Sequence, residues 1–494
     1  MLPERIACQE LGQLTDARLF RELAYVDGKW RAGSSGRTRD VFDPANGHLL
    51  ALVAELDAGE AVDAIDAAQR AFAAWRARLP QERSRLLRAW HEAVVAARQD
   101  LATLMTLEQG KPISEALGEI DYAASFIEWY AEEAKRINVE SVTGHLPAAD
   151  LTVRREPAGV AALVTPWNFP SAMVTRKAAA ALAAGCTVVL HPSMETPLSA
   201  LALAELADRV GLPAGVFNVV PGQGAKVVGA FCRDPRVRVL SFTGSTEVGR
   251  LLATQCADTV KSLVLELGGH APFIVFADGD LERAVDSAVS AKFATSGQDC
   301  LAANRFFVQR EVYDAFAAAF ARRVKALEVG SGFTPGVEIG PLINEKAVAK
   351  CEAHVADALA LGAKLLAGGR RARQGPLFYE PTLLADVPPQ AAILREETFG
   401  PVAALTAFDE EAEVVARAND TDYGLIAYLH SRDYGRISRI TKALDFGMVA
   451  VNRTKVTGAP VPFGGTKQSG LGREGARHGL EAFTELKYLC LDAA

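Results

Sequence analysis

The sequence predicts an α/β protein built from a doubly wound parallel sheet, a second α/β domain and a small β arm. Three observations support this prediction: a length of 494 residues, a regular alternation of strand-like and helical segments, and two extended segments that cannot bury themselves alone. A chain this long exceeds one ordinary hydrophobic core, so two or three domains are expected.

The doubly wound sheet is predicted from short apolar runs that each end in Pro, Gly or Ser. These runs are GVAALVTPW, CTVVLHP, GVFNVVPG and RVRVLSFTGS, and helical stretches such as SALALAELADRVG separate them. Buried parallel strands have this composition, with loops at their carboxyl ends. We therefore expect the sheet to span about residues 156–267. Residues 60–75 place apolar side chains at helical spacing, which predicts an amphipathic surface helix.

A second α/β block begins with APFIVFADGD at 271–280 and runs through the 440s. The segment at 138–157 and the tail from residue 480 onward are short and alternating. We interpret these two segments as paired strands of an oligomerisation arm. The arm predicts a homodimer or a homotetramer, and no residue chooses between them.

The composition is that of a soluble globular protein. The formal net charge is −7 and there is no dense Lys/Arg stripe, so neither nucleic acid nor an anionic membrane is an expected partner. No apolar run approaches the ~18 residues of a membrane span, and the first twenty residues lack the features of a signal peptide. Seven scattered cysteines and eight unclustered histidines predict a cytoplasmic protein with free thiols and no metal site.

One cysteine, Cys300, stands behind a Gly-Gln-Asp turn in ATSGQDCLAANR. A free cysteine is most often a small buried hydrophobe. A turn, however, can lift a side chain into a cleft. The local sequence therefore leaves a packed core thiol and a nucleophile as alternatives.

Two further motifs could carry chemistry. Glu266 ends the apolar run of SLVLELGGH, where a carboxylate is costly unless it is paired, protonated or in use. It is either a helix cap or ion-pair partner, or a general base with a raised pKa. Asn168 lies between two prolines in TPWNFP, a rigid mount for an amide that could stabilise an oxyanion. The alternative is a proline-rich turn with aromatic packing.

Three loops are less specific when taken singly. LSFTGSTEVGR contains Gly244 and Gly249, which would let backbone N–H groups approach an anion at a helix N-terminus. REETFGP is an acid pair followed by a turn, and PFGGTKQSGLGREG is a glycine-dense loop that could close over a site. Each motif alone has a structural explanation, but their joint appearance in this order does not.

Together, TPWNFP, FTGSTEVG, ELGG, GQDC, EETFGP and PFGGTKQSGLGRE resemble the aldehyde dehydrogenase superfamily over nearly the whole chain, and within it the succinate-semialdehyde dehydrogenases most closely. The resemblance implies an aldehyde dehydrogenase-like fold that oxidises a small-molecule aldehyde with NAD or NADP. It implies a dinucleotide-binding domain over 1–137 and 156–267, a catalytic domain over 268–478, and an oligomerisation arm over 138–155 and 479–494.

The resemblance also implies roles for individual residues. Cys300 would attack the aldehyde to give a thiohemiacetal, and hydride transfer to the nicotinamide would leave a thioester. Glu266 would activate the water that hydrolyses it, Asn168 and the Cys300 N–H would hold the oxyanion, and Lys177 would tune the local electrostatics. The implied cofactor-binding residues are Thr165, Trp167, His191, Ser193, Met194, Gly244, Ser245, Val248, Leu267, Glu397 and Phe399.

Two departures from the family pattern concern the cofactor and one concerns a redox switch. His191 stands where a lysine is usual and Met194 where NAD-preferring members often carry a glutamate, so the choice between NAD and NADP stays open. Ala302 stands where some relatives have a second cysteine, so no local disulfide switch is expected and peroxide should oxidise Cys300 directly.

A further departure concerns the substrate. Arg176 matches one of two arginines that hold the substrate carboxylate in succinate-semialdehyde dehydrogenases, but the second is Ala294 here. Thr457 takes the place of a serine, and its loop adds Arg453 and Lys455. We expect succinate semialdehyde or another ω-acidic semialdehyde whose acid group is longer, shorter or differently placed.

Four alternatives stay open. One is glutarate semialdehyde, or a differently charged or neutral aldehyde, as the substrate. Another is acylation of coenzyme A, against which Glu266 argues. The remaining two are a non-catalytic binding protein with this fold and a cysteine hydrolase.

Overall fold

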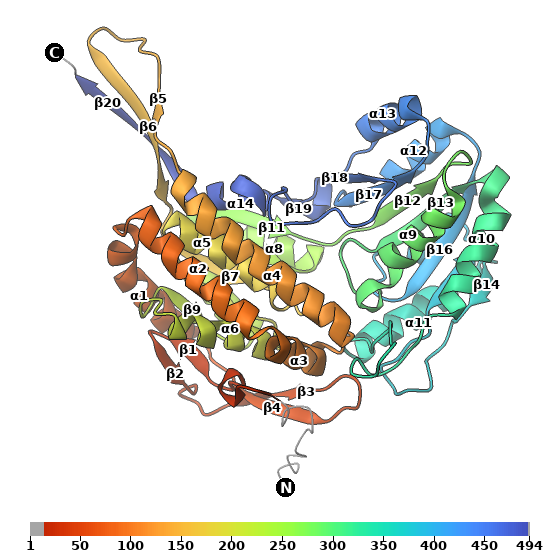
Figure 1. Cartoon of the computed structure of the whole chain (residues 1–494), viewed down its shortest axis with the longest axis horizontal. Helices are drawn as coiled ribbons and strands as arrows, with labels where there is room; N and C mark the ends of the chain where they lie inside the picture. The colour runs from red at the N-terminus through yellow and green to blue at the C-terminus, as the bar shows by residue number, and fades with distance from the viewer. Residues whose placement is uncertain (1–13, 493–494) are drawn as a thin grey trace.

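The computed structural model describes residues 14–492, which form two large mixed sheets, a projecting arm and a hairpin (Figure 1). The larger sheet has eight strands in the order β19-β11-β10-β7-β8-β9-β1-β2. Its five central strands are parallel, and β1, β2 and β19 add antiparallel edges. The strands are β1 (Ala24–Val26), β2 (Lys29–Arg31), β7 (Val160–Val164), β8 (Thr187–His191), β9 (Phe217–Val219), β10 (Val237–Thr243), β11 (Ser262–Glu266) and β19 (Gly470–Leu471).

Helices cover both faces of this sheet, which confirms the predicted doubly wound arrangement. On β7, Val160 and Ala162 pack toward α1, α7 and α8, whereas Ala161 and Leu163 pack toward α2–α6. This period-2 alternation of buried side chains is what a strand covered on both faces requires. The helices are α1 (Ala58–Arg76), α2 (Pro80–Ala96), α3 (Arg98–Gln109), α4 (Ile113–Glu133), α5 (Ala172–Ala184), α6 (Pro197–Arg209), α7 (Gly224–Arg233) and α8 (Thr246–Cys256).

The second sheet has seven strands in the order β14-β15-β16-β13-β12-β17-β18, all parallel except β14. Helices α9 and α10 cover one face, and α11, α12 and α13 cover the other. The elements are β12 (Ala271–Val275), α9 (Leu281–Phe293), β13 (Ala303–Gln309), α10 (Arg310–Lys325), α11 (Glu345–Ala360), β14 (Lys364–Ala367), β15 (Thr382–Ala385), β16 (Val402–Phe408), α12 (Glu411–Asn419), β17 (Ile426–His430), α13 (Tyr434–Ala443) and β18 (Met448–Val451).

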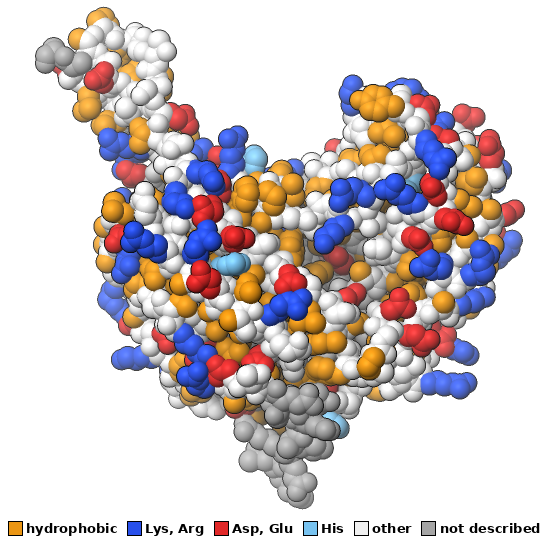
Figure 2. All heavy atoms as spheres, viewed as in Figure 1, with side chains coloured by type: hydrophobic (Ala, Val, Ile, Leu, Met, Phe, Trp, Pro, Cys, Tyr) orange, Lys and Arg blue, Asp and Glu red, His pale blue; other side chains and the backbone are white. Residues whose placement is uncertain are grey.

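The arm is a separate three-stranded sheet that extends from the body (Figures 1 and 2). It contains β5 (Glu140–Ser141), β6 (Ala149–Pro157) and β20 (Thr484–Asp492), and β20 follows α14 (Ala476–Glu481). β6 and β20 are antiparallel along their whole length, so the predicted pairing of the two extended segments is present. β3 (Thr38–Phe42) and β4 (Leu49–Ala54) form the hairpin.

One strand from the second half of the body completes the first sheet. β19 follows the second sheet in the chain, yet Gly470 pairs with Glu266 at the end of β11. The segment predicted to belong to the catalytic domain therefore also closes the edge of the first sheet. Among residues 14–492, no helix is both long and apolar enough to cross a membrane.

Candidate active site

The ELGG and GQDC motifs meet where the two sheets join. β11 ends at Glu266, and the chain passes through Gly268 and Gly269 into β12. Cys300 lies in the turn that precedes β13. A Cβ atom on Gly269 would lie 2.2 Å from the carbonyl oxygen of Cys300, so only glycine allows this approach. The second glycine of ELGG thus brings the cysteine loop against the end of β11.

Asn168 lies between β7 and α5 and reaches the same loop. Its Nδ2 donates a hydrogen bond to the carbonyl oxygen of Gln298 at 3.0 Å. The backbone carbonyl oxygen of Asn168 accepts a hydrogen bond from Lys111 Nζ at 2.7 Å, and Lys111 is ion-paired with Glu119 at 2.6 Å. Lys111, Glu119 and Gln298 were not predicted as site residues. Lys111 and Gln298 stand in the LEQGKP and GQDC segments, but their partners lie far away in the sequence.

The thiol of Cys300 is half-buried and protonated at neutral pH. Burial raises its pKa well above the ordinary value, and the neighbouring carboxyl groups of Asp299 and Glu397 raise it further. Only the thiolate is a strong nucleophile, so this cysteine needs a base.

Glu266 is a buried carboxyl group without a hydrogen-bond partner for either side-chain oxygen among the described residues. Burial raises its pKa well above the ordinary value, the charge of Glu474 adds to the rise, and Arg176 and Lys177 oppose it. Gly464 lies directly beside it, because a Cβ there would be 2.8 Å from Glu266 Oε1. An unpaired carboxyl group of this kind is suited to accept a proton.

Lys177 and Arg176 both bind Glu474, which the sequence analysis did not identify. Lys177 Nζ is ion-paired with Glu474 and also donates to Ser241 Oγ at 3.0 Å. Arg176 Nε lies 2.7 Å from Glu474 Oε2. Burial works to raise the pKa of Glu474, but the two cations hold it below the ordinary value. Glu474 precedes a glycine in the quoted GREG segment, the only local signal that could have singled it out.

Of the three loop residues predicted to bind substrate, Arg453, Lys455 and Thr457, one lies near Arg176. The hydroxyl of Tyr122 lies close enough to Thr457 and Arg176 for both residues to lower its pKa. Arg453 and Lys455 are exposed on the same loop.

The gap left by the missing second arginine lies close to that loop. Thr454 Oγ1 donates to Ser290 Oγ at 3.5 Å, one helical turn before the exposed Ala294. The structure thus brings the basic loop next to Ala294, but it shows no contact of Arg453 or Lys455 with Arg176.

Four predicted cofactor residues surround the loop between β10 and α8. Gly244 N–H donates to the carbonyl oxygen of Glu266 at 3.0 Å. Ser245 caps α8 by accepting from Val248 N–H at 3.3 Å. The side chain of Leu267 packs on Gly249, where a Cβ would lie 2.4 Å away. The arrangement leaves the helix N-terminus open, which suits an anionic ligand.

A second group of cofactor residues lies on the other side of Gly268. Glu397 Oε1 accepts from Gly269 N–H at 2.9 Å, and burial raises the pKa of Glu397 to about 7. Phe399 has a left-handed backbone with φ of 56°, a strained conformation for a bulky residue. Its ring lies 5.4 Å from that of Trp167, edge to face.

The remaining cofactor residues follow β7 and β8. Thr165 N–H donates to the carbonyl oxygen of His191 at 3.1 Å. Burial lowers the pKa of His191, and its Nδ1 lies 3.0 Å from the carbonyl oxygen of Val220, so the ring is neutral at pH 7. Met194 Sδ accepts from Gly222 N–H at 3.1 Å. Ser193 Oγ accepts from the backbone N–H of Glu195 at 3.3 Å.

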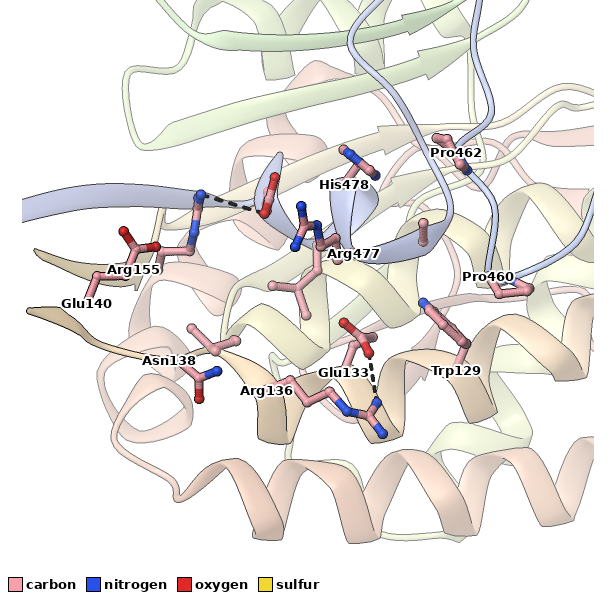
Figure 3. A pocket seen from close by; sticks show the side chains of 14 residues that line it. Trp129, Glu133, Arg136, Asn138, Glu140, Arg155, Pro460, Pro462, Arg477 and His478 are labelled. Atoms are coloured by element: carbon pink, nitrogen blue, oxygen red, sulfur yellow. Dashed lines mark hydrogen bonds and ion pairs between the residues drawn. The ribbon is translucent and has the colours of Figure 1, made fainter. Parts of the chain in front are cut away.

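Two cavities lie away from Cys300. One of about 610 Å³ lies at the base of the arm between α4 and α14, with Trp129, Arg155 and Arg477 in its wall (Figure 3). Another of about 650 Å³ lies behind the β3–β4 hairpin and reaches Met194 and Glu195. Neither contains a predicted catalytic or substrate-binding residue.

A doubly wound sheet with an exposed helix N-terminus at the carboxyl edge of its strands, next to Cys300, Glu266 and Asn168, is typical of a dinucleotide-dependent oxidoreductase. The family model described as "Aldehyde dehydrogenase family" matches residues 30–489. The chain therefore belongs to the aldehyde dehydrogenase family, and its cofactor is NAD or NADP.

Three similar proteins support the assignment. The chain is 54% identical to the aspartate-semialdehyde dehydrogenase (non-phosphorylating) of Halomonas elongata, covering 97% of this chain and 98% of that protein. It is 53% identical to the succinate-semialdehyde dehydrogenase [NADP(+)] GabD of Escherichia coli K12, covering 97% and 99%. The crystal structure of succinate-semialdehyde dehydrogenase from Burkholderia pseudomallei superposes with a TM-score of 0.97 at 51% identity, covering 97% and 100%.

Proposed function

We propose that this aldehyde dehydrogenase oxidises a semialdehyde that carries a second acid group, with Cys300 as the nucleophile. The observation that carries the proposal is the buried guanidinium of Arg176 beside the reaction centre. Burial alone would lower its pKa, but Glu474, Glu266 and other nearby groups raise it, so it is always charged. A buried cation at this place favours an anionic substrate group.

In the first step, Cys300 gives up its proton to solvent and its sulfur bonds to the aldehyde carbon, which converts the carbonyl oxygen to an oxyanion. One N–H of the Asn168 side-chain amide donates to the backbone carbonyl oxygen of Gln298, and the other N–H would donate to the oxyanion. Lys111 fixes the backbone of Asn168. The amide is therefore held before the substrate arrives, so stabilising the developing charge costs little reorganisation.

In the second step, the adduct loses hydride and becomes a thioester. When bound, the nicotinamide of NAD or NADP supplies the hydride acceptor. The loop from Gly244 to Ser245 and the start of α8 would bind its pyrophosphate, and Glu397 a hydroxyl of its ribose. These residues fit a dinucleotide because Ser245, Glu247 and Val248 at the start of α8 are exposed, and Glu397 Oε2 lies close to Gly268, where a Cβ would be 2.9 Å away.

In the last step, Glu266 takes a proton from the water that attacks the thioester. The carbon–sulfur bond breaks, the sulfur leaves as thiolate and regains a proton, and the carboxylic acid is released. The lack of a hydrogen-bond partner for Glu266 among the described residues supports this role, since no cation or donor holds its proton-accepting oxygens.

The length and placement of the substrate's acid group are part of the proposal. The two curated relatives act, by their names, on aspartate semialdehyde and succinate semialdehyde, and both are about equally similar to this chain. Ala294 lacks the second cation, while Thr454 holds Arg453 and Lys455 near that gap. We infer a semialdehyde of four or five carbons with its acid group at the far end.

We further propose that the arm assembles the chain into a homodimer or a homotetramer in the cytoplasm. Three large apolar side chains on β20 support the assembly, because Leu486, Tyr488 and Leu491 are each at least half exposed. The six cysteines within the described part of the chain are all free thiols, the state that a reducing compartment maintains.

The test is a kinetic panel with succinate, glutarate and aspartate semialdehydes and a neutral aldehyde of matched length. Each would be measured with NAD and with NADP, with Cys300→Ala as the control for the nucleophile. We expect at least one acidic semialdehyde to exceed the neutral aldehyde in kcat/KM by tenfold or more, which corresponds to about 1.4 kcal/mol. A higher kcat/KM for the neutral aldehyde than for every acidic one, or turnover by Cys300→Ala, would overturn the proposal.

A further inference from the structure

The guanidinium of Arg176 has one edge, at Nη2, that faces a sulfur atom. Its Nε faces Glu474 at 2.7 Å, and the ring of Phe463 lies 4.2 Å from its central carbon. Its Nη2, however, donates to the sulfur of Met173 at 2.9 Å. A thioether is a weak acceptor for a charged donor. An anionic oxygen would bind this edge much better.

Tyr122 on α4 lies beside this edge. Its ring packs edge to face on Phe126 at 4.7 Å, and it is in the same apolar cluster as Met173. Its hydroxyl lies close enough to Arg176 and Thr457 for both residues to lower its pKa. Burial raises the pKa of Tyr122 more than these contacts lower it, so the phenol keeps its proton at neutral pH.

The arrangement fixes what the hydroxyl can do. A guanidinium has only donors, so the nearby Arg176 favours a Tyr122 hydroxyl that turns its oxygen toward the cation. Its proton then points away from the cation, toward an acceptor. Thr457 can accept it when no substrate is bound. An incoming carboxylate would be a stronger acceptor than a neutral hydroxyl.

We propose that the Tyr122 hydroxyl binds the acid group of the substrate together with Arg176 and so takes the place of the missing second cation at Ala294. The inference rests on the proposed function, since it names a specificity residue for the same substrate. One guanidinium edge and one phenolic O–H would each hold one oxygen of a carboxylate. Such a site discriminates by directed hydrogen bonds rather than by charge alone.

The experiment compares Tyr122→Phe with the wild type on succinate semialdehyde, glutarate semialdehyde and a neutral aldehyde of matched length. We expect the KM for the best acidic substrate to rise at least tenfold while kcat stays within threefold. The KM for the neutral aldehyde should stay within twofold, because its chain has no group that reaches Tyr122.

Two further variants make the test sharper. Tyr130→Phe removes a buried hydroxyl two turns further along α4 and should leave both KM values within twofold of the wild type. Thr457→Val should change the KM for acidic substrates in the same direction as Tyr122→Phe, by a smaller factor.

Either of two results would overturn the inference: an unchanged KM for acidic substrates in Tyr122→Phe, or an equal rise for the neutral aldehyde. The failure of the proposed function is a separate result, because it would appear in the wild type as a preference for neutral aldehydes.

Discussion

The reaction centre and the charged cluster beside it each contain a buried carboxyl group, and the two groups differ in their partners and in the direction of their pKa shifts. Glu266 has no hydrogen-bond partner within residues 14–492, and its pKa is raised. Glu474 binds Arg176, Lys177 and Ser241, and its pKa is lowered. A carboxylate held by two cations is a fixed charge, whereas one left alone exchanges its proton readily. The difference indicates that Glu266 is available for chemistry and that Glu474 is structural.

The strongest test of this comparison is Glu266→Gln. The amide keeps the shape but cannot accept a proton from water, so kcat should fall by about 10²–10⁴. Hydrolysis of the thioester is the proposed step that fails, so one NAD(P)H per active site should still form in a burst. Rapid-mixing measurements of absorbance would separate the burst from the steady state. A steady-state rate within tenfold of the wild type would contradict the proposed role of Glu266.

The second test is Glu474→Gln, which should act on stability first. Removal of this charge leaves Arg176 and Lys177 buried without compensation, and breaking a buried ion pair typically costs about 3–5 kcal/mol. Lys177 can shed its proton, since burial already lowers its pKa, but Arg176 cannot. Urea unfolding should therefore show a clearly lower midpoint.

Asp409→Asn is the matched control for that experiment. Asp409 is paired with Arg310 at 2.6 Å, but both side chains are more than half exposed. Water screens such a pair, so its loss should leave the urea midpoint unchanged. Equal effects of Glu474→Gln and Asp409→Asn would mean that the cluster around Arg176 is not the buried charge network described above.

The sequence predicted the fold and singled out the candidate reaction centre because the signals of both are local. Cys300 follows a Gly-Gln-Asp turn, and Glu266 ends an apolar strand next to two glycines, so each stands out within ten residues. Glu474 binds Lys177 across 297 positions of the chain, and no pattern near either residue announces the contact. Tyr122 likewise lies in a long helix with many apolar residues, and no sequence pattern near it distinguishes it from them.

The last and smallest test is the pH dependence of kcat/KM in the free enzyme. The pKa values of Cys300 and Glu266 are both raised well above their ordinary values, so each group loses its proton at a higher pH than a free thiol or carboxyl group does. The reactive form has lost one proton from the pair, as thiolate or as carboxylate, so kcat/KM should rise about tenfold per pH unit through the neutral and alkaline range. Glu474 raises the pKa of Glu266, so in Glu474→Gln this rise should begin at lower pH. A profile that is flat from pH 6 to pH 9 would contradict the raised values, because groups with ordinary carboxyl pKa values are already ionised there.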